Sequence, residues 1–432
     1  MKVAFHTLGC KVNQYDTEAV INEFKSRGYT IVDFDEVADI YVINTCTVTN
    51  VGDRKSRQMI RRAHRQNPQA KVVVMGCYSQ TSPEEAIEIE GVNLVLGTRD
   101  RQGIVDLVES LNIDEKKSLV KDIFELDEFE EIPVVQFEGR TRATIKVQDG
   151  CNQFCSYCKV PYARGKSRSR LVDNVLSQVK EISDQGYREI VLTGVHLGLY
   201  GRDLNPPVTL ENLVKLISEV PGIKRVRISS IDPNEIEDSF LEMMAANPKI
   251  CPHLHIPLQS GSDTILSLMR RRYSTDDFEH IVEKARQMVP GIGITTDVIV
   301  GFPGEDEKEF AKTLAFAEKM KLSRVHVFQY SPRSGTPAAT MPNQVPKNEK
   351  EQRSKALIDL ATRLGKEFHS SFVNEVLEVL VEENEGVIGV GLTGNYIRTK
   401  IKFPNEGDWV GKLIKVRVLS ANEDGIEGEF LA

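Results

Sequence analysis

Three cysteines in the middle of the chain are spaced closely enough to bind one metal centre. Cys151, Cys155 and Cys158 follow the pattern C-x-x-x-C-x-x-C. A structural zinc site closes with four ligands, and no fourth cysteine or nearby histidine follows this group. A 4Fe-4S cluster held by three cysteines instead leaves one iron open for a cofactor or a substrate. The spacing therefore favours such a cluster, and the alternatives are an incomplete zinc loop or a redox-active pair.

Three further cysteines lie far apart in the first 120 residues, but at equivalent places. Cys10, Cys46 and Cys77 each follow an apolar run that is rich in β-branched residues. These runs cover residues 3–8, 39–44 and 71–75, and a fourth covers 92–96. Helical patterns between the runs indicate a parallel sheet, whose strands end along one edge. We expect the three thiols to converge there into a second cluster site; the alternative is that each is a small buried residue ending its strand.

Six more apolar runs alternate with helical patterns between residues 141 and 335. They cover 143–147, 189–192, 225–229, 253–257, 294–300 and 324–328. Six strand and helix repeats predict a partial (β/α)6 barrel, in which chemistry takes place at the carboxyl ends of the strands. The loop with Cys151, Cys155 and Cys158 leaves the end of the first run. The predicted barrel and the cysteine motif therefore indicate the same site.

The central cysteine motif, with Tyr157 just before its last cysteine, resembles that of the radical S-adenosylmethionine (SAM) enzymes. The resemblance implies that Thr193 and Gly194, after the second strand, hold the methionyl amino group of SAM. We expect further contacts to SAM from other strand ends: Ser230, Gln259, Asp297 and Gly301.

Basic residues predict where an anionic substrate binds. Arg54, Arg57 and Arg61 recur at helical spacing and share one helix face, next to the loop with Cys46. We expect this face to contact RNA phosphates, and the alternative is an ordinary solvated surface. Four more arginines flank the predicted mouth of the barrel and are expected to hold the substrate: Arg164, Arg168, Arg170 and Arg271.

The last part of the chain changes to short strands between residues 376 and 430, separated by glycine and asparagine turns. This pattern suggests a small β-barrel, a common nucleic-acid module, although a lid or an oligomerisation module is the alternative. Tyr396, Arg398, Lys400 and Lys402 alternate on one strand and offer a ring and three cations to RNA. The expected domains are 1–120, 141–372 with its trailing helix, and 373–432, and residues 121–140 form an acidic, solvated linker.

Composition limits the class of protein. A net charge of −8 argues against a protein that coats nucleic acid, although a local basic face can still bind RNA. No stretch approaches the roughly 20 apolar residues of a membrane span, and the N-terminus shows no signal-peptide pattern. We therefore expect a cytoplasmic α/β protein without a membrane partner.

Over its whole length the chain is similar to the methylthiotransferases, radical SAM enzymes with an N-terminal cluster domain, a central barrel and a C-terminal RNA-binding barrel of the TRAM type. The stretches LGCKVNQ (8–14) and NTCTVTN (44–50) look most like the branch that acts on N6-threonylcarbamoyladenosine at position 37 of tRNA. The isopentenyladenosine branch tends to have Cys-Gln-Met-Asn in the first loop, and the ribosomal-protein branch Cys-Pro-Lys-Asn.

This resemblance implies two 4Fe-4S clusters and SAM as cofactors. The cluster on Cys151, Cys155 and Cys158 would cleave SAM to a 5′-deoxyadenosyl radical, which removes hydrogen from C2 of the adenine. A cluster on the three N-terminal cysteines would supply the sulfur, and a second SAM the methyl group. The implied partners are the tRNA anticodon loop, an electron donor such as flavodoxin or ferredoxin, and a sulfur donor. The alternatives are isopentenyladenosine tRNA or a ribosomal protein as the substrate, another radical SAM reaction, and a non-catalytic, metal-containing RNA-binding protein.

Overall fold

The N-terminal part of the chain is a six-stranded parallel sheet in the order β2-β1-β3-β4-β5-β6. The computed structural model describes residues 1–431 apart from 126–127, 133, 135–136 and 138. The strands are β1 (Lys2–Thr7), β2 (Thr30–Val32), β3 (Ile40–Thr45), β4 (Lys71–Gly76), β5 (Val92–Val95) and β6 (Lys117–Ser118). The helices are α1 (Lys11–Ser26), α2 (Asn50–Gln66), α3 (Cys77–Thr81), α4 (Pro83–Ile87) and α5 (Ile104–Ser110).

Alternate residues of this sheet enter two separate apolar clusters. In β4, Val72 and Val74 pack with α2, whereas Val73 and Met75 pack with α1 and α5. Successive side chains of a strand point to opposite faces, so a sheet covered by helices on both faces needs an unbroken apolar run. This requirement explains why β4 carries no polar side chain between Val72 and Gly76.

The central part holds six parallel strands in two hydrogen-bonded groups, β7-β10-β11 and β12-β13-β14. Isolated parallel bridges from Val226 to Ile250 and from Ser230 to His255 connect the groups. The strands are β7 (Arg142–Lys146), β10 (Glu189–Thr193), β11 (Arg225–Ile228), β12 (His253–His255), β13 (Gly293–Val300) and β14 (Arg324–Gln329), with the short pair β8 (Gln148–Asp149) and β9 (Arg168–Ser169) beside them. The predicted partial barrel is confirmed.

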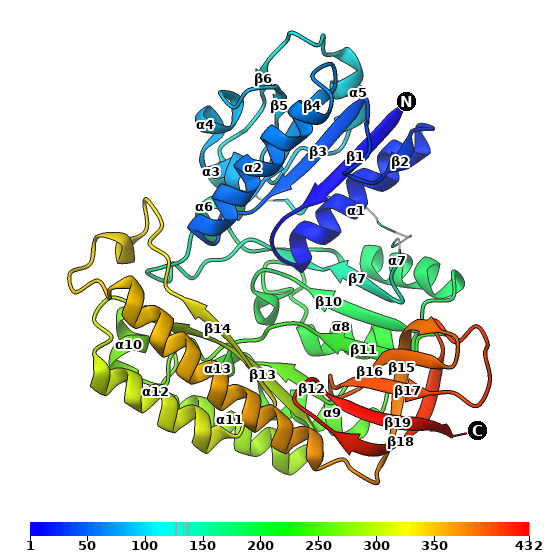
Figure 1. Ribbon diagram of the computed structural model, residues 1–432, viewed down its shortest axis with the longest axis vertical. Coiled ribbons are helices and arrows are strands. Elements are labelled where there is room, and N and C mark those ends of the chain that lie inside the picture. Colours follow the sequence, from blue (N-terminus) through cyan, green and yellow to red (C-terminus); the bar gives the residue numbers. More distant parts are fainter. Residues whose placement is uncertain (126–127, 133, 135–136, 138, 432) are drawn as a thin grey trace.

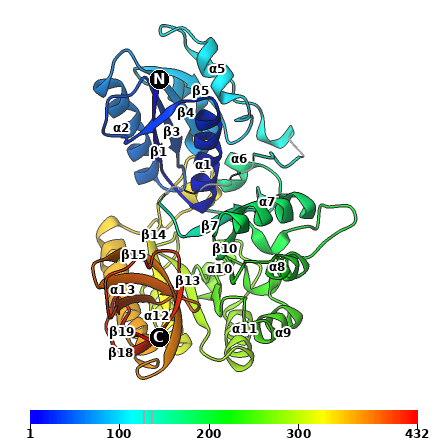
Figure 2. The same cartoon turned by 90° about the vertical axis from the view of Figure 1, so that its right-hand side faces the viewer.

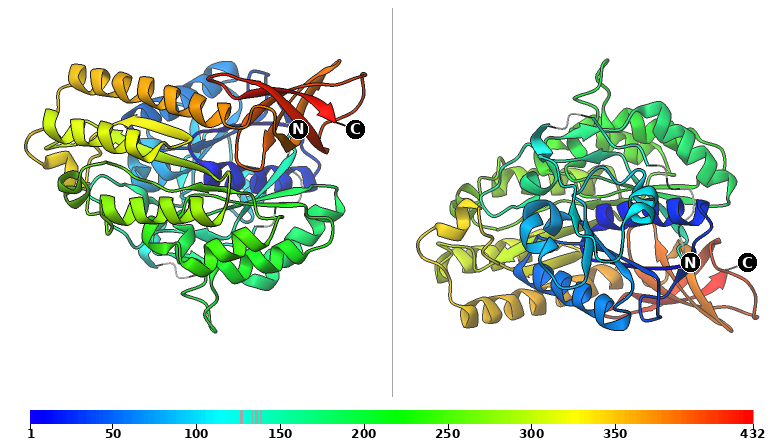
Figure 3. Two further views of the ribbon diagram at one scale, coloured as in Figure 1. Left: turned by 90° about the horizontal axis from the view of Figure 1, so that it is seen from below. Right: turned by 90° about the horizontal axis from the view of Figure 1, so that it is seen from above.

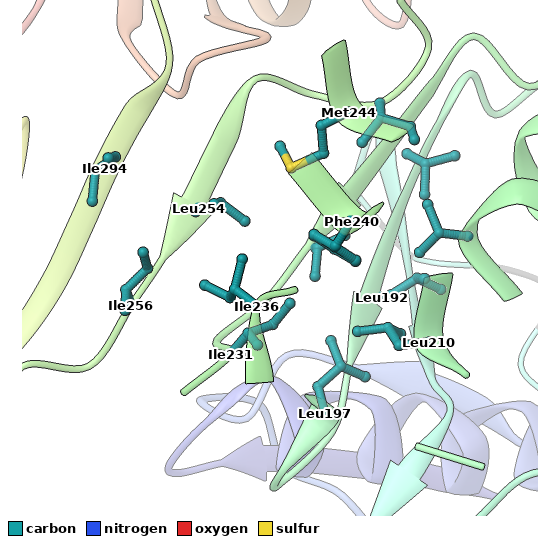
Figure 4. Packing of buried hydrophobic residues seen from close by; sticks show 14 of the residues in the cluster. Leu192, Leu197, Leu210, Ile231, Ile236, Phe240, Met244, Leu254, Ile256 and Ile294 are labelled. Atoms are coloured by element: carbon teal, nitrogen blue, oxygen red, sulfur yellow. The ribbon is translucent and has the colours of Figure 1, made fainter. Parts of the chain in front are cut away.

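Helices cover the outer face of this partial barrel. They are α6 (Val160–Arg164), α7 (Val172–Asp184), α8 (Leu210–Glu219), α9 (Asp238–Ala246), α10 (Asp263–Leu268), α11 (Thr275–Met288), α12 (Glu307–Met320) and α13 (Lys347–Ser370). Figure 4 shows the packing: Leu192 of β10 and Leu254 of β12 lie in one apolar cluster with Phe240 and Met244 of α9. The helix α13 runs beside β14 (Figure 1).

The C-terminal part is a closed barrel in the order β15-β16-β17-β19-β18. Its strands are β15 (Val376–Glu385), β16 (Ile388–Thr393), β17 (Arg398–Lys402), β18 (Leu413–Ala421) and β19 (Ile426–Leu431). Arg227 of β11 donates to the carbonyl oxygens of Thr393 and Gly394 at 3.0 and 2.9 Å. The β16–β17 loop therefore closes the amino-terminal end of the central strands, opposite the cysteine loop.

The central part contacts both the N-terminal part and the C-terminal barrel. Figure 2 shows the N-terminal sheet at one end, with the central helices and the C-terminal barrel side by side at the other. Seen from below, α13 and the C-terminal barrel follow one another along one side of the molecule (Figure 3). None of the helices described here is both long and apolar enough to cross a membrane.

Two details differ from the sequence predictions. The short strands β2, β6, β8 and β9 were not predicted, because two or three residues are too short to show a periodic pattern. The acidic segment is also not simply a solvated linker, since Glu130 pairs with Arg101 and Glu131 pairs with Arg170. Two residues of that prediction, Asp127 and Pro133, lie outside the described residues.

Candidate active site

The three N-terminal cysteines stand at the ends of three neighbouring strands. Cys10 follows β1 through Leu8 and Gly9, Cys46 directly follows β3, and Cys77 follows β4 and begins α3. Because β1, β3 and β4 are adjacent in the sheet, their carboxyl ends bring residues 36 and 31 positions apart to one edge. Burial raises the pKa of Cys46 and of Cys77, Cys10 adds to both rises, and Cys46 adds to that of Cys77. These effects place the three groups within electrostatic reach of one another.

The absence of a side chain at Gly9 leaves space beside the thiol of Cys46. Gly9 has a φ of +107°, and a Cβ added there would lie 3.2 Å from Sγ of Cys46 and 2.9 Å from Nδ2 of Asn13. A side chain at this position would therefore both strain the backbone and press on a thiol.

Asn13 connects the three N-terminal loops. Its Nδ2 donates to the carbonyl oxygens of Leu8 at 2.7 Å and Thr45 at 2.9 Å. Its Oδ1 lies 3.7 Å from Sγ of Cys77. Burial raises the pKa of Cys77 to about 12, so its thiolate persists only where a cation compensates the charge.

The central cysteine loop runs from β8 to α6, at the carboxyl end of β7. Sγ of Cys151 accepts a hydrogen bond from the backbone N–H of Gln153 at 3.3 Å and lies 3.5 Å from Nδ1 of His196. Burial lowers the pKa of His196, but the contact with Cys151 and the carboxylate of Glu235, 2.6 Å away, together raise it to about 10. His196 thus presents positive charge to the thiolate.

Arg271 turns towards the same loop. Its Nη1 lies 3.4 Å from Sγ of Cys155, and its Nη2 pairs with Asp232 at 2.6 Å. Burial raises the pKa of Cys155, and this guanidinium opposes the rise. Burial also raises the pKa of Cys158 to about 12. The prediction that Arg271 holds the substrate does not fit this placement, because the side chain is engaged with a cysteine and an aspartate.

Gln148 joins the cysteine loop to the loop after β10, and the sequence reading missed it. Its Nε2 donates to the carbonyl oxygen of Gly150 at 2.8 Å, and its Oε1 accepts from the backbone N–H of His196 at 2.7 Å. A Cβ on Gly194 would lie 2.8 Å from the same Oε1. Gln148 lies two residues after β7, on the way into the cysteine motif. This position was the signal that could have identified it in the sequence.

The residues predicted to contact SAM lie along the carboxyl ends of the central strands. Thr193 ends β10 and is buried, and Ser230 follows β11 and is exposed. The backbone N–H of Gln259 donates to the carbonyl oxygen of Asp297 at 2.8 Å, and that of Gly301 donates to Glu305 at 2.6 Å. Tyr157 packs against Phe302. Their contacts to SAM remain predictions.

A half-exposed polar group on three neighbouring central strands contains Asp297, a predicted SAM contact, together with two histidines that were not among the predicted site residues. Nε2 of His255 lies 3.3 Å from Oδ2 of Asp297, and Nδ1 of His255 lies 2.9 Å from Oγ1 of Thr295. His326 of β14 completes the group. These side chains offer hydrogen bonds to a molecule in the barrel opening.

Arg164 is buried between the two cysteine sites. Its Nη1 lies 3.0 Å from both carboxylate oxygens of Asp149, and its Nη2 donates to Asp16 at 2.9 Å and to Oδ1 of Asn13 at 2.6 Å. Asp16 also pairs with Arg101 at 2.7 Å and Lys146 at 2.6 Å. This buried network joins the N-terminal part to the central barrel.

The prediction that Arg164, Arg168 and Arg170 contact the substrate is therefore corrected. All three are buried, with at most 3% of each residue exposed. Arg168 donates to the carbonyl oxygen of Arg164, and Arg170 pairs with Glu131. A guanidinium is costly to bury without partners, and the partners came from distant parts of the chain that the sequence pattern did not reveal.

The other basic residues are accessible. On α2, Arg54 and Arg61 are exposed, and Arg57 is half-buried with its guanidinium 5.7 Å from the ring centre of Tyr78. Arg398, Lys400 and Lys402 are exposed on β17. Tyr396 is not free to stack on RNA, because its ring lies 4.6 Å from that of His253 and 5.0 Å from the guanidinium of Arg227.

Both cysteine groups fit iron–sulfur clusters. All seven cysteines are free, and each group supplies three soft thiolates, the ligand type of such clusters. Arg271 and His196 face the central group, and Arg164 influences the pKa of Cys77 in the other. These cations would offset the negative charge of cluster and thiolates, and the backbone N–H of Gln153 is the kind of donor that tunes a cluster.

Two family models match the chain. The one described as "Uncharacterized protein family UPF0004" matches residues 2–97, and the one described as "Radical SAM superfamily" matches residues 145–317. Each match contains one group of three cysteines.

Curated relatives match almost the whole chain. The threonylcarbamoyladenosine tRNA methylthiotransferase MtaB of Bacillus subtilis is 48% identical over 99% of this chain and 96% of its own length. The tRNA-2-methylthio-N(6)-dimethylallyladenosine synthase of Acetivibrio thermocellus is 33% identical over 99% of this chain and 90% of its own length. Both are enzymes whose names describe methylthio chemistry on tRNA.

Among solved structures, the radical S-adenosylmethionine methyltransferase TsrM of Kitasatospora setae superposes with a TM-score of 0.58. It is 15% identical, and the match covers 78% of this chain and 75% of that chain. At this identity the match shows a shared fold.

Proposed function

This chain belongs to the tRNA methylthiotransferases, a family of radical SAM enzymes, and we propose that it converts N6-threonylcarbamoyladenosine at position 37 of tRNA to its 2-methylthio derivative. The relative at 48% identity acts on threonylcarbamoyladenosine, and the one at 33% acts on the dimethylallyl nucleoside. The higher identity to the first relative supports threonylcarbamoyladenosine as the substrate.

One observation carries the proposal: the two groups of three cysteines are tied to the same buried side chain, Arg164. On one side Arg164 binds Asp149, whose carboxylate accepts from the N–H of Gly150, next to Cys151. On the other side it binds Asn13, which lies against Cys77. Two adjacent redox sites suit a reaction that needs both a radical and a sulfur atom.

The cysteines would hold one 4Fe-4S cluster at each site, with SAM at the central one. When bound, these groups supply the one-electron chemistry that removes hydrogen from an unactivated carbon, together with the inserted sulfur and the methyl group. The protein's own residues position these groups and offset their charge. His196 and Arg271 offset the negative charge beside the central thiolates, and Gln148 fixes the two loops that flank the proposed SAM site.

We propose that tRNA is held by two accessible basic surfaces. Arg54 and Arg61 lie on α2, which begins four residues after Cys46, and β17 carries three exposed cations. An electron donor such as flavodoxin or ferredoxin and a sulfur donor complete the reaction, which would take place in the cytoplasm with its tRNA. The domain limits that we propose are 1–120, 141–372 and 373–432, connected by 121–140.

The test is nucleoside mass spectrometry on tRNA incubated with anaerobically reconstituted protein, SAM and a reductant. A methylthio mass gain on the threonylcarbamoyl nucleoside alone supports the proposal. A gain on the isopentenyl nucleoside alone retains the chemistry and rejects the substrate. SAM cleavage without any gain rejects methylthiolation of both nucleosides.

Replacing single cysteines separates the roles of the two sites. We expect Cys46→Ala to retain SAM cleavage to 5′-deoxyadenosine and to lose methylthiolation, because only the sulfur-supplying site is removed. Cys155→Ala is expected to lose both activities. Chromatography of 5′-deoxyadenosine and mass spectrometry of the nucleoside measure the two reactions in one sample. Intact methylthiolation by Cys46→Ala would refute the assignment of the N-terminal site.

A further inference from the structure

A cavity of about 270 Å³ lies where the three parts of the chain meet. It is lined from the N-terminal part by Lys11 and Gln14, from the central barrel by Thr144 and Val191, and from the C-terminal barrel by Glu382 and Tyr396, among others. Lys11 is the first residue of α1 and directly follows Cys10. The cavity therefore reaches the residue that follows Cys10 in the chain.

Lys11 is the exposed cation of this cavity that has no partner. Within the part of the chain that the structure describes, its side chain has no ion pair and no hydrogen bond, and it is exposed. The other cations of the cavity are engaged: Arg142 pairs with Glu382 at 2.7 Å, and Arg140 donates to Gln14 at 3.1 Å.

The surroundings of Lys11 favour an anion. The groups that act most strongly on its charge are the phenol of Tyr396, which favours the ammonium form, and Arg142 and Arg227, which add positive potential. Glu189 also favours the ammonium form, but its carboxylate is already bound by Arg227 at 2.7 Å. Charge-assisted hydrogen bonds to a carboxylate are strong where water is partly excluded. A carboxylate entering the cavity would find an ammonium group that no carboxylate of the described residues binds.

The chemistry of adenine places the N6 substituent near this ammonium group. C2 and C6 flank ring atom N1, and N6 is attached to C6, so a group that acts at C2 is close to the substituent on N6. Lys11 adjoins Cys10, one of the residues proposed to hold the sulfur-supplying cluster. The threonylcarbamoyl substituent carries a carboxylate, whereas an isopentenyl substituent carries no charge.

We propose that Lys11 is a specificity-determining residue that binds the carboxylate of the threonylcarbamoyl group from within this cavity. The inference rests on the proposed function and adds the group that selects the substrate. An uncharged N6 substituent that fills the cavity would displace water from Lys11 without supplying a charged partner, which disfavours such substituents.

The experiment compares two synthetic anticodon stem-loop RNAs that differ in one group. One carries the threonylcarbamoyl nucleoside, and the other carries its carboxamide, made from threoninamide. Binding of each RNA to the reconstituted enzyme is measured by fluorescence anisotropy without reductant, so that no turnover occurs. We expect the wild type to bind the carboxylate RNA about 10- to 100-fold more tightly, the range of one hydrogen bond to a charged group.

In Lys11→Gln we expect this ratio to fall to near one, and in Lys11→Arg we expect most of it to remain, because the charge is kept. Arg140→Gln is the matched control: it removes one positive charge from the same cavity, and the ratio should stay at the wild-type value. Each ratio is taken within one protein, so partial loss of a cluster does not affect the comparison.

Two results would overturn the assignment. The first is a wild type that does not distinguish the two RNAs. The second is a Lys11→Gln variant that keeps the full ratio, whether it binds both RNAs as tightly as the wild type or binds both more weakly by the same factor. Failure of the proposed function is recognised separately, because the wild type would then methylthiolate no threonylcarbamoyl RNA in the presence of reductant.

Discussion

Replacing Asp16 by asparagine is expected to loosen the junction between the N-terminal sheet and the central barrel. Asp16 is 2% exposed and pairs with three cations: Lys146 at 2.6 Å, Arg101 at 2.7 Å and Arg164 at 2.9 Å. Asparagine keeps the shape and removes the charge. The three cations remain buried with one carboxylate fewer, so part of their charge is left uncompensated.

The size of the effect can be derived in two ways. Removing one partner of a buried ion pair costs about 3–5 kcal/mol. Independently, Arg101, Lys146 and Arg164 overcome the effect of burial and lower the pKa of Asp16 from 3.8 to about 2. A shift of this size corresponds to roughly 2–3 kcal/mol of stability. The first value is larger because it includes the cost to the cations that lose their partner. We expect a loss of about 3 kcal/mol at neutral pH.

The same shift predicts the pH dependence. The pKa of Asp16 is lower in the folded protein than in the unfolded chain, so its contribution is complete above pH 4 and is lost as the pH falls through about 2. Asparagine does not titrate. The difference in stability between the wild type and Asp16→Asn should therefore be largest at neutral pH and should shrink below about pH 4.

Urea unfolding followed by circular dichroism measures the effect, with Asp106→Asn as the matched control. Asp106 pairs with Arg27 at 2.8 Å, but its side chain is 68% exposed, and a surface pair of this kind contributes about 0–1 kcal/mol. If Asp16→Asn unfolds at the same urea concentration as Asp106→Asn, the buried network does not stabilise the junction and the reasoning is wrong.

Two further changes test the proposed cluster site and the proposed RNA surface. Gly9→Ala should bind less iron after reconstitution, because the new Cβ would lie 3.2 Å from Sγ of Cys46 at a φ of +107°. Gly28→Ala is the control: its φ is +81° and no atom lies within 4 Å of the new Cβ, so only backbone strain is added and the iron content should stay unchanged. Equal iron content in both variants would contradict this prediction. Arg61→Gln should lower the salt dependence of tRNA binding, measured as log Kd against log salt, by about 0.7–0.9 for one lost phosphate contact. Arg62→Gln on the same helix, where the arginine is already paired with a carboxylate, should leave the slope unchanged; equal slopes for both variants would argue against the surface.

Most of the strands could be located from the sequence because their signal is local. The run predicted at 71–75 is β4 (Lys71–Gly76), and that predicted at 294–300 is β13 (Gly293–Val300). A strand buried on both faces is largely apolar, and such runs are visible without knowledge of their partners. The strand β2 (Thr30–Val32) was missed because three residues do not form a pattern.

The accessibility of charged residues could not be predicted in the same way. Arg164 and Arg61 both appear in the sequence as members of basic runs, yet Arg164 is buried and Arg61 is exposed. The difference lies in partners that are remote in the chain: Arg164 bonds to Asp16, 148 residues away. A charge is buried only where such a partner offsets the cost of removing it from water.

The sequence by itself determined which side chains are expected to hold the clusters and in what order the strands and helices follow. The spacing of Cys151, Cys155 and Cys158 is local, and each N-terminal cysteine is fixed to the end of its own strand. Only the tertiary structure decided that Arg164 joins the two cysteine sites and that Lys11 faces a cavity between three parts of the chain. Ligand type and strand pattern arise from neighbouring residues, whereas burial and charge pairing arise from contacts between segments that fold together from distant positions.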